Sequence, residues 1–338
     1  MRISVIGAGS WGTAVSWLLS GKGHEVRLWA REPEIADGVN CDHRNPLYLP
    51  DVPLAASVVA SSDIGEALEG AEAVVMVTPS MGVRTTAEAM QPHLGSDTPV
   101  VILSKGVENG TFMLMTEVLA DVFGNDMRIA GLSGPNHAEE VSRGIPSATV
   151  VASHNDAVAQ LFQDVFMAPF FRVYTNTDVI GVELCGASKN VVAIAAGMCD
   201  GLGYGDNTKA TLMTRGLAEM TRLGAAMGAN PLTYMGLAGM GDLIVTCASR
   251  HSRNRGLGEL IATGGTLEEY TKRTQMVVEG AAACVSIDEL SKRKGIELPI
   301  THMVREILYE GLSVHAAGEM LMGREARDEL HGMGFVVD

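Results

Sequence analysis

Short apolar runs alternate with helical stretches over roughly the first half of the 338-residue chain. The runs are rich in Val, Ile and Ala and have the length of buried strands. Strands that alternate with helices predict a parallel sheet covered by helices on both faces. We expect strands at residues 2–6, 25–29, 57–60, 73–77, 99–103, 127–132, 148–152 and 170–174.

After residue 178 the strand pattern ends, and apolar positions recur at helical spacing. We expect helices at residues 182–198, 209–227, 231–237, 257–263, 276–294, 299–310 and 314–324, with a short helix after Asp242. A chain of this length exceeds the size at which a single core stops growing. The sequence therefore predicts two domains, an α/β domain at residues 1–178 and an all-α domain at residues 179–338.

The first predicted strand runs into a glycine-rich turn, Gly7-Ala8-Gly9-Ser10-Trp11-Gly12, which opens a helix. In a GxGxxG fingerprint the first glycine permits the turn, the second lets the backbone approach a pyrophosphate, and the third allows close packing of helix on sheet. The helix N-terminus presents free N–H groups to the phosphates. Because a second strand follows at residues 24–30, we expect a Rossmann-type domain that binds a dinucleotide at Gly7, Gly9 and Gly12.

The second strand is followed by Arg31 and Glu32. An acid at this point binds the ribose 2′-hydroxyl of NAD, whereas an arginine accommodates the 2′-phosphate of NADP. We therefore expect NADPH as the preferred cofactor, with NADH tolerated. The alternative is that Arg31 is an exposed strand-end side chain, and Glu32 disfavours the extra phosphate.

Loops rich in Ser, Thr, Pro and Gly follow three of the predicted strands, at residues 78–80, 104–106 and 133–137. Ligands of open α/β sheets bind outside the carboxyl ends of the strands, near the topological switch point. We therefore expect these loops beside the nicotinamide end of the cofactor.

Lys189 lies inside the predicted helix 182–198, and helical spacing places Cys185, Gly186 and Ala193 on its face. These neighbours are small and uncharged. Either the lysine extends to solvent, or it points into a dry cleft where desolvation lowers its pKa. A lysine with a pKa near neutrality exchanges a proton with a ketone or alcohol oxygen.

Lys105 and Asp242 are the other candidate catalytic residues. Lys105 follows a central strand, and we expect it in the same cleft if the helical domain closes over the sheet edge. There it disfavours protonation of Lys189 and polarises a carbonyl; the alternative is an exposed strand-end lysine. Asp242 precedes an apolar run, so the sequence favours a helix N-cap, with orientation of a lysine as the alternative role.

The most basic stretch, at residues 249–256, combines arginines with hydroxyl and amide groups. Guanidinium groups match phosphate oxygens, and a helix that begins after Gly256 adds free N–H groups. We expect an anion site here; the alternative is a solvated run of arginines.

Composition excludes several other classes. The formal net charge of −15 argues against a nucleic-acid surface. The five cysteines form no CxxC pair, which predicts reduced thiols in a cytoplasm rather than a disulfide framework or a metal site. The longest apolar run, residues 191–198, is too short to cross a bilayer, so we expect no membrane insertion.

Taken in order along nearly the whole chain, these motifs closely resemble those of the bacterial NAD(P)-dependent sn-glycerol-3-phosphate dehydrogenase family. The motifs are residues 7–12, 104–106, 134–135, 189–190, 200–206, 239–242 and 252–255. The resemblance implies reversible reduction of dihydroxyacetone phosphate to sn-glycerol 3-phosphate by NAD(P)H, for phospholipid synthesis. It also implies a substrate held between the domains and a possible homodimer.

The resemblance assigns roles to single residues. Lys189 matches the family's proton acceptor in alcohol oxidation, and Asn136 stands where the family more often has a small hydroxyl residue. Besides the three glycines of the turn, the cofactor contacts expected are Ser10, Trp11, Arg31, Lys105, Ala138, Arg253, Val277 and Glu279. The substrate contacts expected are Lys105, Gly134, Asn136, Lys189, Asp242, Ser252, Arg253 and Asn254.

Two other functions remain alternatives. A β-hydroxy acid dehydrogenase also has a helical second half, but it needs a carboxylate site, and the cluster at residues 252–255 favours phosphate. A non-catalytic NADH sensor needs no desolvated lysine, and it needs a partner surface that the sequence does not indicate.

Overall fold

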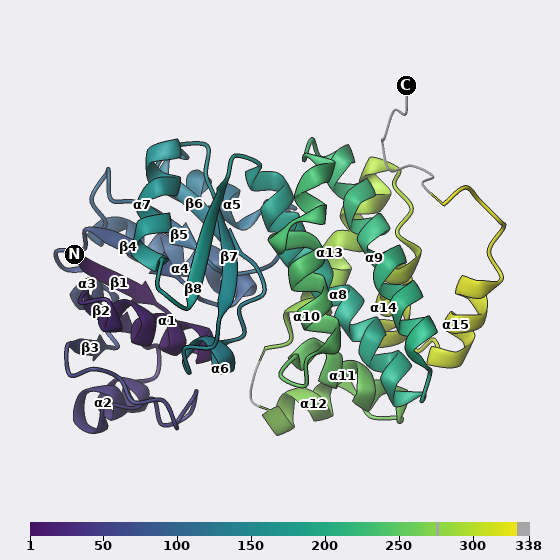
Figure 1. Cartoon of the computed structure of the whole chain (residues 1–338), viewed down its shortest axis with the longest axis horizontal. Helices are drawn as coiled ribbons and strands as arrows, with labels where there is room; N and C mark the ends of the chain where they lie inside the picture. The colour runs from purple at the N-terminus through teal and green to yellow at the C-terminus, as the bar shows by residue number, and fades with distance from the viewer. Residues whose placement is uncertain (275–276, 330–338) are drawn as a thin grey trace. The chain divides into compact units, whose positions relative to one another are not determined.

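The computed structural model describes residues 1–274 and 277–329, and it divides into two compact units (Figure 1). Unit 1 holds residues 1–104 and 115–179, and unit 2 holds Lys105–Leu114 and the chain from Ile180 onward. The sequence analysis did not anticipate that residues 105–114 belong to unit 2. The predicted boundary between residues 178 and 179, as a limit of independently folding domains, stays a prediction.

Unit 1 is built on an eight-stranded sheet with the order β3-β2-β1-β4-β5-β6-β7-β8. The strands are β1 Arg2–Ile6, β2 Glu25–Trp29, β3 Val58–Ser61, β4 Ala73–Met76, β5 Val100–Ile102, β6 Ile129–Ser133, β7 Ser147–Ala152 and β8 Phe171–Asn176. Each predicted strand is confirmed to within two residues at either end. The strand order reverses between β1 and β4, so the loops after these two strands flank the switch point.

One pair of strands departs from the expected parallel sheet. β6 and β7 run antiparallel, with Leu132 opposite Val151, whereas the other neighbours are parallel. A parallel connection needs a crossover, usually a full helix, and this connection contains only the four-residue helix α6 Ala138–Val141. The short connection therefore returns the chain antiparallel.

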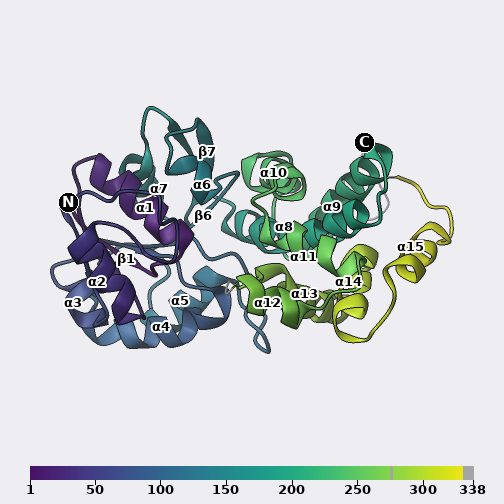
Figure 2. The same cartoon turned by 90° about the horizontal axis from the view of Figure 1, so that it is seen from below.

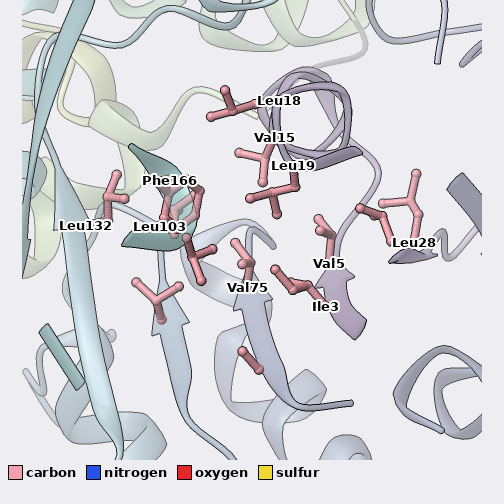
Figure 3. Close-up of a cluster of buried hydrophobic side chains, with 14 of the residues drawn as sticks. Ile3, Val5, Val15, Leu18, Leu19, Leu28, Val75, Leu103, Leu132 and Phe166 are labelled. Atoms are coloured by element: carbon pink, nitrogen blue, oxygen red, sulfur yellow. The ribbon is translucent and has the colours of Figure 1, made fainter. Parts of the chain in front are cut away.

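The core of unit 1 lies between the sheet and its helices. Val15 and Leu19 of α1 Ser10–Gly21 point toward Val5 and Val75 in the sheet, and Phe166, the last residue of α7 Asp156–Phe166, lies beside Leu103 (Figure 3). These side chains are almost fully buried, so their packing sets the position of α1 over the strands. The other helices of unit 1 are α2 Pro33–Asp42, α3 Ile64–Leu68, α4 Val83–Met90 and α5 Met115–Phe123.

Unit 2 is helical, as predicted. Its helices are α8 Val179–Gly201, α9 Asp206–Ala226, α10 Asp242–Ala248, α11 Arg253–Ala262, α12 Leu267–Thr274, α13 Glu279–Lys294, α14 Pro299–Tyr309 and α15 Val314–Met322. The helix predicted from residue 257 begins earlier, at Arg253. The helix α12 was not predicted, because Tyr270 is its one buried residue and its other positions give no apolar period. Residue 276, where the next helix was expected to begin, lies outside the described residues.

The helix α8 forms the centre of unit 2, among α9, α10, α11 and α13 (Figure 2). Leu184, Val191 and Ile194 of α8 are fully buried in the core of this unit. A Cβ on Gly258 of α11 would stand 2.0 Å from the carbonyl oxygen of Ile194, so only glycine permits this close approach. By length and composition α8 is also apolar enough to cross a membrane, but 89% of its most apolar window is buried inside the protein, as in a core helix.

A buried carboxylate caps the helix α14 from outside. Glu219 of α9 accepts hydrogen bonds from the N–H groups of Ile300, at 2.6 Å, and Thr301, at 3.2 Å. Because Pro299 begins α14, these are the first N–H groups that this helix offers. Burial raises the pKa of Glu219 to about 7, although the two backbone hydrogen bonds act in the opposite direction.

We expect Glu219→Gln to remove a pH dependence of stability. The pKa of Glu219 in the folded protein lies above the unfolded value of about 4.3. Protonation of Glu219 therefore stabilises the folded wild type fully below about pH 4.3, and this stabilisation is lost as the pH rises to about 7. Over this pH range the unfolding free energy of the wild type should therefore fall by about 3 kcal/mol relative to that of the variant. Urea titrations at pH 5, 6 and 7.5 measure it, and a difference that is constant with pH contradicts the raised pKa.

Candidate active site

The glycine turn after β1 has the geometry of a phosphate-binding loop. Gly7 has a φ of +119°, which side chains rarely adopt, and a Cβ on Gly12 would stand 1.8 Å from the carbonyl oxygen of Gly7. A Cβ on Gly9 would meet no protein atom within 4 Å, so the space above this residue is open. The first turn of α1 has no side-chain cap. An open position over an uncapped helix N-terminus is what a pyrophosphate requires, so the turn fits a dinucleotide.

The turn is braced by Asn45, which the sequence analysis did not identify. Its fully buried amide donates to the carbonyl oxygen of Ala8 at 2.8 Å and to Oγ1 of Thr13 at 2.9 Å. Trp11 lies beside Phe171, with ring centroids 6.4 Å apart. These protein contacts therefore support the shape of the turn.

Arg31 lies just past the end of β2, as expected, with 81% of its side chain exposed. Its guanidinium contacts Oε1 of Glu32 at 2.6 Å. The carboxylate of Glu32 therefore competes with a 2′-phosphate for Arg31, and the preference for NADPH stays a prediction.

The loop after β6 carries three more predicted contacts. A Cβ on Gly134 would stand 2.8 Å from Cα of Thr149 on β7. Asn136 is buried and donates to Oγ1 of Thr149 at 3.2 Å, and Ala138 is the buried first residue of α6. The loop is therefore packed tightly against β7, and the ligand contacts of these residues stay predictions.

Three charged residues of unit 2 form one group. Nζ of Lys189 lies 2.6 Å from Oδ1 of Asp242, and Nζ of Lys105 lies 2.8 Å from Oδ2 of the same carboxylate. The side chains of Lys189 and Asp242 are 6% and 2% exposed, and that of Lys105 is 17% exposed. Lys189 therefore does not extend to solvent, and two ammonium groups share one carboxylate.

Burial sets the proton affinities in this group. Desolvation lowers the pKa of Lys189 to about 8, assisted by the charge of Lys105 and opposed by that of Asp242. Burial by itself raises the pKa of Asp242, but the two ammonium groups outweigh it and hold the pKa below its usual value. Lys189 can therefore gain or lose a proton near neutral pH while Asp242 stays ionised.

The helix N-cap predicted for Asp242 is wrong. Asp242 is the first residue of α10, the N-cap is Gly241, and no side-chain cap is made. The carboxylate turns to the two lysines, whose ammonium groups give it short, charge-assisted hydrogen bonds in a buried place.

The site also contains Thr246, which the sequence analysis missed. Its Oγ1 accepts a hydrogen bond from Nζ of Lys189 at 2.6 Å and donates to the carbonyl oxygen of Asp242 at 2.6 Å. The sequence did contain one indication of this role: Thr246 follows Asp242 by four residues, which places both side chains on the same face of a helix. Within the described part of the chain, Asp242 and Thr246 take two of the three donors of Lys189, which leaves one N–H for a further oxygen.

The segment at residues 249–256, where an anion site is predicted, is arranged differently from the expectation, and the anion site itself stays a prediction. Ser252 is the N-cap of α11, and its Oγ accepts from the N–H of Arg255 at 3.2 Å. The helix therefore begins at Arg253, ahead of Gly256, and the N–H groups of Arg253 and Asn254 lie at its start. The Arg255 guanidinium pairs with Asp200 and Glu259, each at 2.6 Å, so it is engaged within the protein.

A buried amide pair connects this helix end to α8. Nδ2 of Asn254 donates to Oδ1 of Asn190 at 3.0 Å, and Oδ1 of Asn254 accepts from the N–H of Gly280 at 2.9 Å. Asn190 follows Lys189 directly, so α8 joins the charged group to the start of α11. No local pattern marks the pairing of residues 190, 254 and 280, because these positions are distant in sequence.

The late cofactor contacts predicted lie beside this pair. Arg253 donates to the carbonyl oxygen of Val277 at 3.1 Å, and Glu279 begins α13. The side chain of Val277 is exposed. Their contacts with a cofactor stay predictions. Among residues 1–274 and 277–329, no group of three or more His, Cys, Asp or Glu side chains is arranged to hold a metal ion.

Comparison with known proteins identifies related chains. Two family models match, described as the N-terminus (residues 2–159) and the C-terminus (residues 178–319) of NAD-dependent glycerol-3-phosphate dehydrogenase.

Similar proteins cover almost the whole chain. A glycerol-3-phosphate dehydrogenase [NAD(P)+] of Salinibacter ruber is 49% identical over 97% of this chain and 96% of its own length. One of Moorella thermoacetica is 49% identical over 97% of each chain. The crystal structure of glycerol-3-phosphate dehydrogenase from Coxiella burnetii is 37% identical, covers 96% of this chain and 99% of its own, and superimposes with a TM-score of 0.92.

Proposed function

This chain belongs to the NAD-dependent glycerol-3-phosphate dehydrogenase family, and we propose from that premise that it reduces dihydroxyacetone phosphate to sn-glycerol 3-phosphate, reversibly, with NADPH or NADH. The observation that carries the proposal is the buried Lys189, with a pKa of about 8 and one carboxylate shared with Lys105. The product supplies glycerophospholipid synthesis. The relatives favour this function over β-hydroxy acid oxidation and over a non-catalytic sensor.

The residues divide the reaction between them. Gly9 and the start of α1 would hold the pyrophosphate of the nicotinamide cofactor, which would supply the hydride for the carbonyl carbon of the triose phosphate. Lys189 donates a proton to the carbonyl oxygen, which becomes the hydroxyl oxygen of the product. Lys105 stabilises the negative charge that develops on that oxygen before the proton arrives.

Asp242 keeps the two lysines in place during this transfer. Its two carboxylate oxygens each bind one ammonium group, so neither lysine rotates away from the reacting oxygen. With both lysines protonated the group carries a net positive charge, which attracts an anionic substrate.

The phosphate of the substrate binds at the start of α11. The backbone N–H groups and the guanidinium of Arg253 supply charged and neutral donors, and the second N–H of the Asn254 amide adds another. Ser252 contributes by capping the helix, which fixes the direction of these donors.

We further propose a cytoplasmic protein without nucleic-acid partners or membrane insertion. The five cysteines are free thiols, three of them buried, as in a reducing compartment. A homodimer is proposed on the family resemblance alone.

The function is tested by following the loss of reduced-nicotinamide absorbance. We expect rapid oxidation of NADPH and NADH with dihydroxyacetone phosphate and at least tenfold lower kcat/KM with free dihydroxyacetone, since one charged hydrogen bond to a phosphate contributes about 1.5–3 kcal/mol. The ratio of the two cofactor rates measures the effect of Arg31. Protein that binds NADPH but oxidises it with neither ketone contradicts the proposal.

Arg253→Ala should abolish most of the preference for the phosphorylated ketone. Arg250→Ala is the matched control, because this exposed arginine of the same stretch lies outside the proposed contacts and should leave kcat/KM unchanged. An equal loss in both variants would show that general positive charge, rather than the start of α11, selects the phosphate.

A further inference from the structure

Lys105 is carried by a short hairpin that belongs to unit 2. The chain enters unit 2 after Ser104 and returns to unit 1 at Met115. Within this segment Val107 and Leu114 form an antiparallel bridge, and the N–H of Glu108 donates to the carbonyl oxygen of Met113 at 2.9 Å. We call residues 105–114 the Lys105 hairpin.

The hairpin is anchored in the core of the helical unit. The side chains of Val107, Phe112 and Leu114 are buried in the same cluster as Leu184 of α8 and Ile287 of α13. Burial of three apolar side chains from so short a segment contributes much more free energy to its attachment than the one ion pair at its base does.

Two polar contacts hold the hairpin to α13 as well. The guanidinium carbon of Arg293 lies 4.1 Å from the ring centroid of Phe112, within the range of a cation–π contact. Oγ of Ser286 donates to Oδ1 of Asn109 near the tip of the hairpin. Both partners lie on α13, so one side of the hairpin is attached to this helix.

Phe112 adopts an unfavourable backbone conformation to reach this place. Its φ of +64° lies in the left-handed region, where a bulky residue is rare. Such a strained backbone conformation persists only where the surrounding contacts stabilise it by more than the strain costs, and it is found most often at functional sites. The buried ring beneath Arg293 is the contact that offsets it here.

The base of the same hairpin reaches the reacting groups. Nζ of Lys105 contacts Oδ2 of Asp242, and Asp242 contacts Lys189 through its other oxygen. The anchor and the reacting groups are thus joined through one short segment. Lys105 stays with Lys189 because the whole hairpin belongs to their unit.

We propose that Phe112 is a positioning residue of the reaction, which anchors the Lys105 hairpin so that Lys105 stays on Asp242 beside Lys189. The proposal rests on the proposed function, since it concerns the same chemical step. It differs from a purely structural role because the effect of Phe112 on catalysis passes through Lys105.

A double-mutant cycle separates these roles. The variants are Phe112→Ala, Lys105→Met and the pair together, each assayed with dihydroxyacetone phosphate and NADPH. We expect Phe112→Ala to lower kcat about tenfold or more in the wild-type background and less than about twofold in the Lys105→Met background, because the group that Phe112 positions is then absent. Within each background, Phe112→Ala should change the Kd for NADPH by less than about twofold, so that the loss of kcat is not a loss of cofactor binding.

The pH profile of alcohol oxidation gives a second readout. The charged and titratable groups around Lys189 are Asp242 and Cys247 of α10 and Lys105 of the hairpin. Displacing Lys105 removes the repulsion between the two ammonium groups, so the acid limb of kcat/KM should move to higher pH in both single variants and no further in the pair.

Further variants keep the test decisive. Phe112→Tyr retains the ring and should restore most of the lost kcat. If Phe112→Ala does not fold, as judged by thermal melting, the milder Asn109→Ala, which removes the contact with Ser286, replaces it in the cycle. An equal loss of kcat from Phe112→Ala in both backgrounds would overturn the inference about Phe112, and so would an unchanged kcat in the single variant. Neither result would contradict the proposed function. Wild-type protein that does not turn over the triose phosphate would overturn the proposed function as well.

Discussion

Lys189→Met is expected to lower kcat by about 10²–10⁴-fold in both directions, the usual contribution of general acid–base catalysis. Methionine keeps most of the length and apolar surface of the lysine stem but cannot exchange a proton. The Kd for NADPH should change little, because the predicted cofactor turn lies in unit 1, away from α8 in the chain. Steady-state kinetics and fluorescence titration with NADPH measure the two quantities separately.

The pH dependence of the wild type should have opposite signs in the two directions. Ketone reduction needs protonated Lys189, so kcat/KM should fall as the pH rises above about 8. Alcohol oxidation needs the neutral amine, so kcat/KM should rise up to about the same pH. Both limbs should be absent from the residual activity of Lys189→Met.

Lys272→Met is the control for this variant. Lys272 also pairs with a carboxylate in unit 2, Glu268 at 2.6 Å, but it is exposed on α12 and outside the site. It should leave kcat and the pH profile unchanged. Near-normal turnover in Lys189→Met would remove Lys189 from its role as proton donor.

Asp242→Asn should reduce both activity and stability. The amide cannot neutralise two buried ammonium groups, and removing one partner of a buried ion pair typically costs about 3–5 kcal/mol. Loss of the carboxylate also removes the interaction that raises the pKa of Lys189, so this pKa should fall further below about 8 and a smaller fraction of the lysine should carry a proton to donate. Denaturant titration measures the stability, and the pH profile of ketone reduction measures the fall in pKa.

Asp288→Asn provides a control matched in burial. The side chain of Asp288 is 2% exposed, like that of Asp242, and it pairs with Lys292 at 2.7 Å and His302 at 3.2 Å within unit 2. We expect a smaller loss of stability, because Lys292 and His302 are partly exposed to solvent, and an unchanged kcat well below the melting temperature. If Asp242→Asn lost stability but kept its kcat and its pH profile, Asp242 would be a structural residue only.

Much of the fold was predictable because it depends on neighbouring residues. The eight strands follow from short apolar runs, and the turn at Gly7 and Gly12 follows from glycine spacing, since backbone conformation and local packing depend on positions a few residues apart. Polar segments were harder. The helix α12 has one buried residue, and the start of α11 depends on a serine cap inside a basic run, so neither gives an apolar period.

The same distinction between local and distant interactions decides which parts of the candidate site were predictable. Lys189 stood out because an isolated charge on a small, apolar helix face must be either exposed or functional. Lys105 and Asp242 were candidates as well, but their contacts with Lys189 could not be derived from the sequence. Asp242 is 53 positions from Lys189 and 137 from Lys105, and the local pattern around Asp242 is that of a helix cap. Only the folded chain shows that its carboxylate turns inward, that Lys105 belongs to the helical unit, and that Asn190 holds Asn254. Local periodicity is encoded by adjacent residues, whereas the charge pairing of buried groups depends on which distant segments pack together.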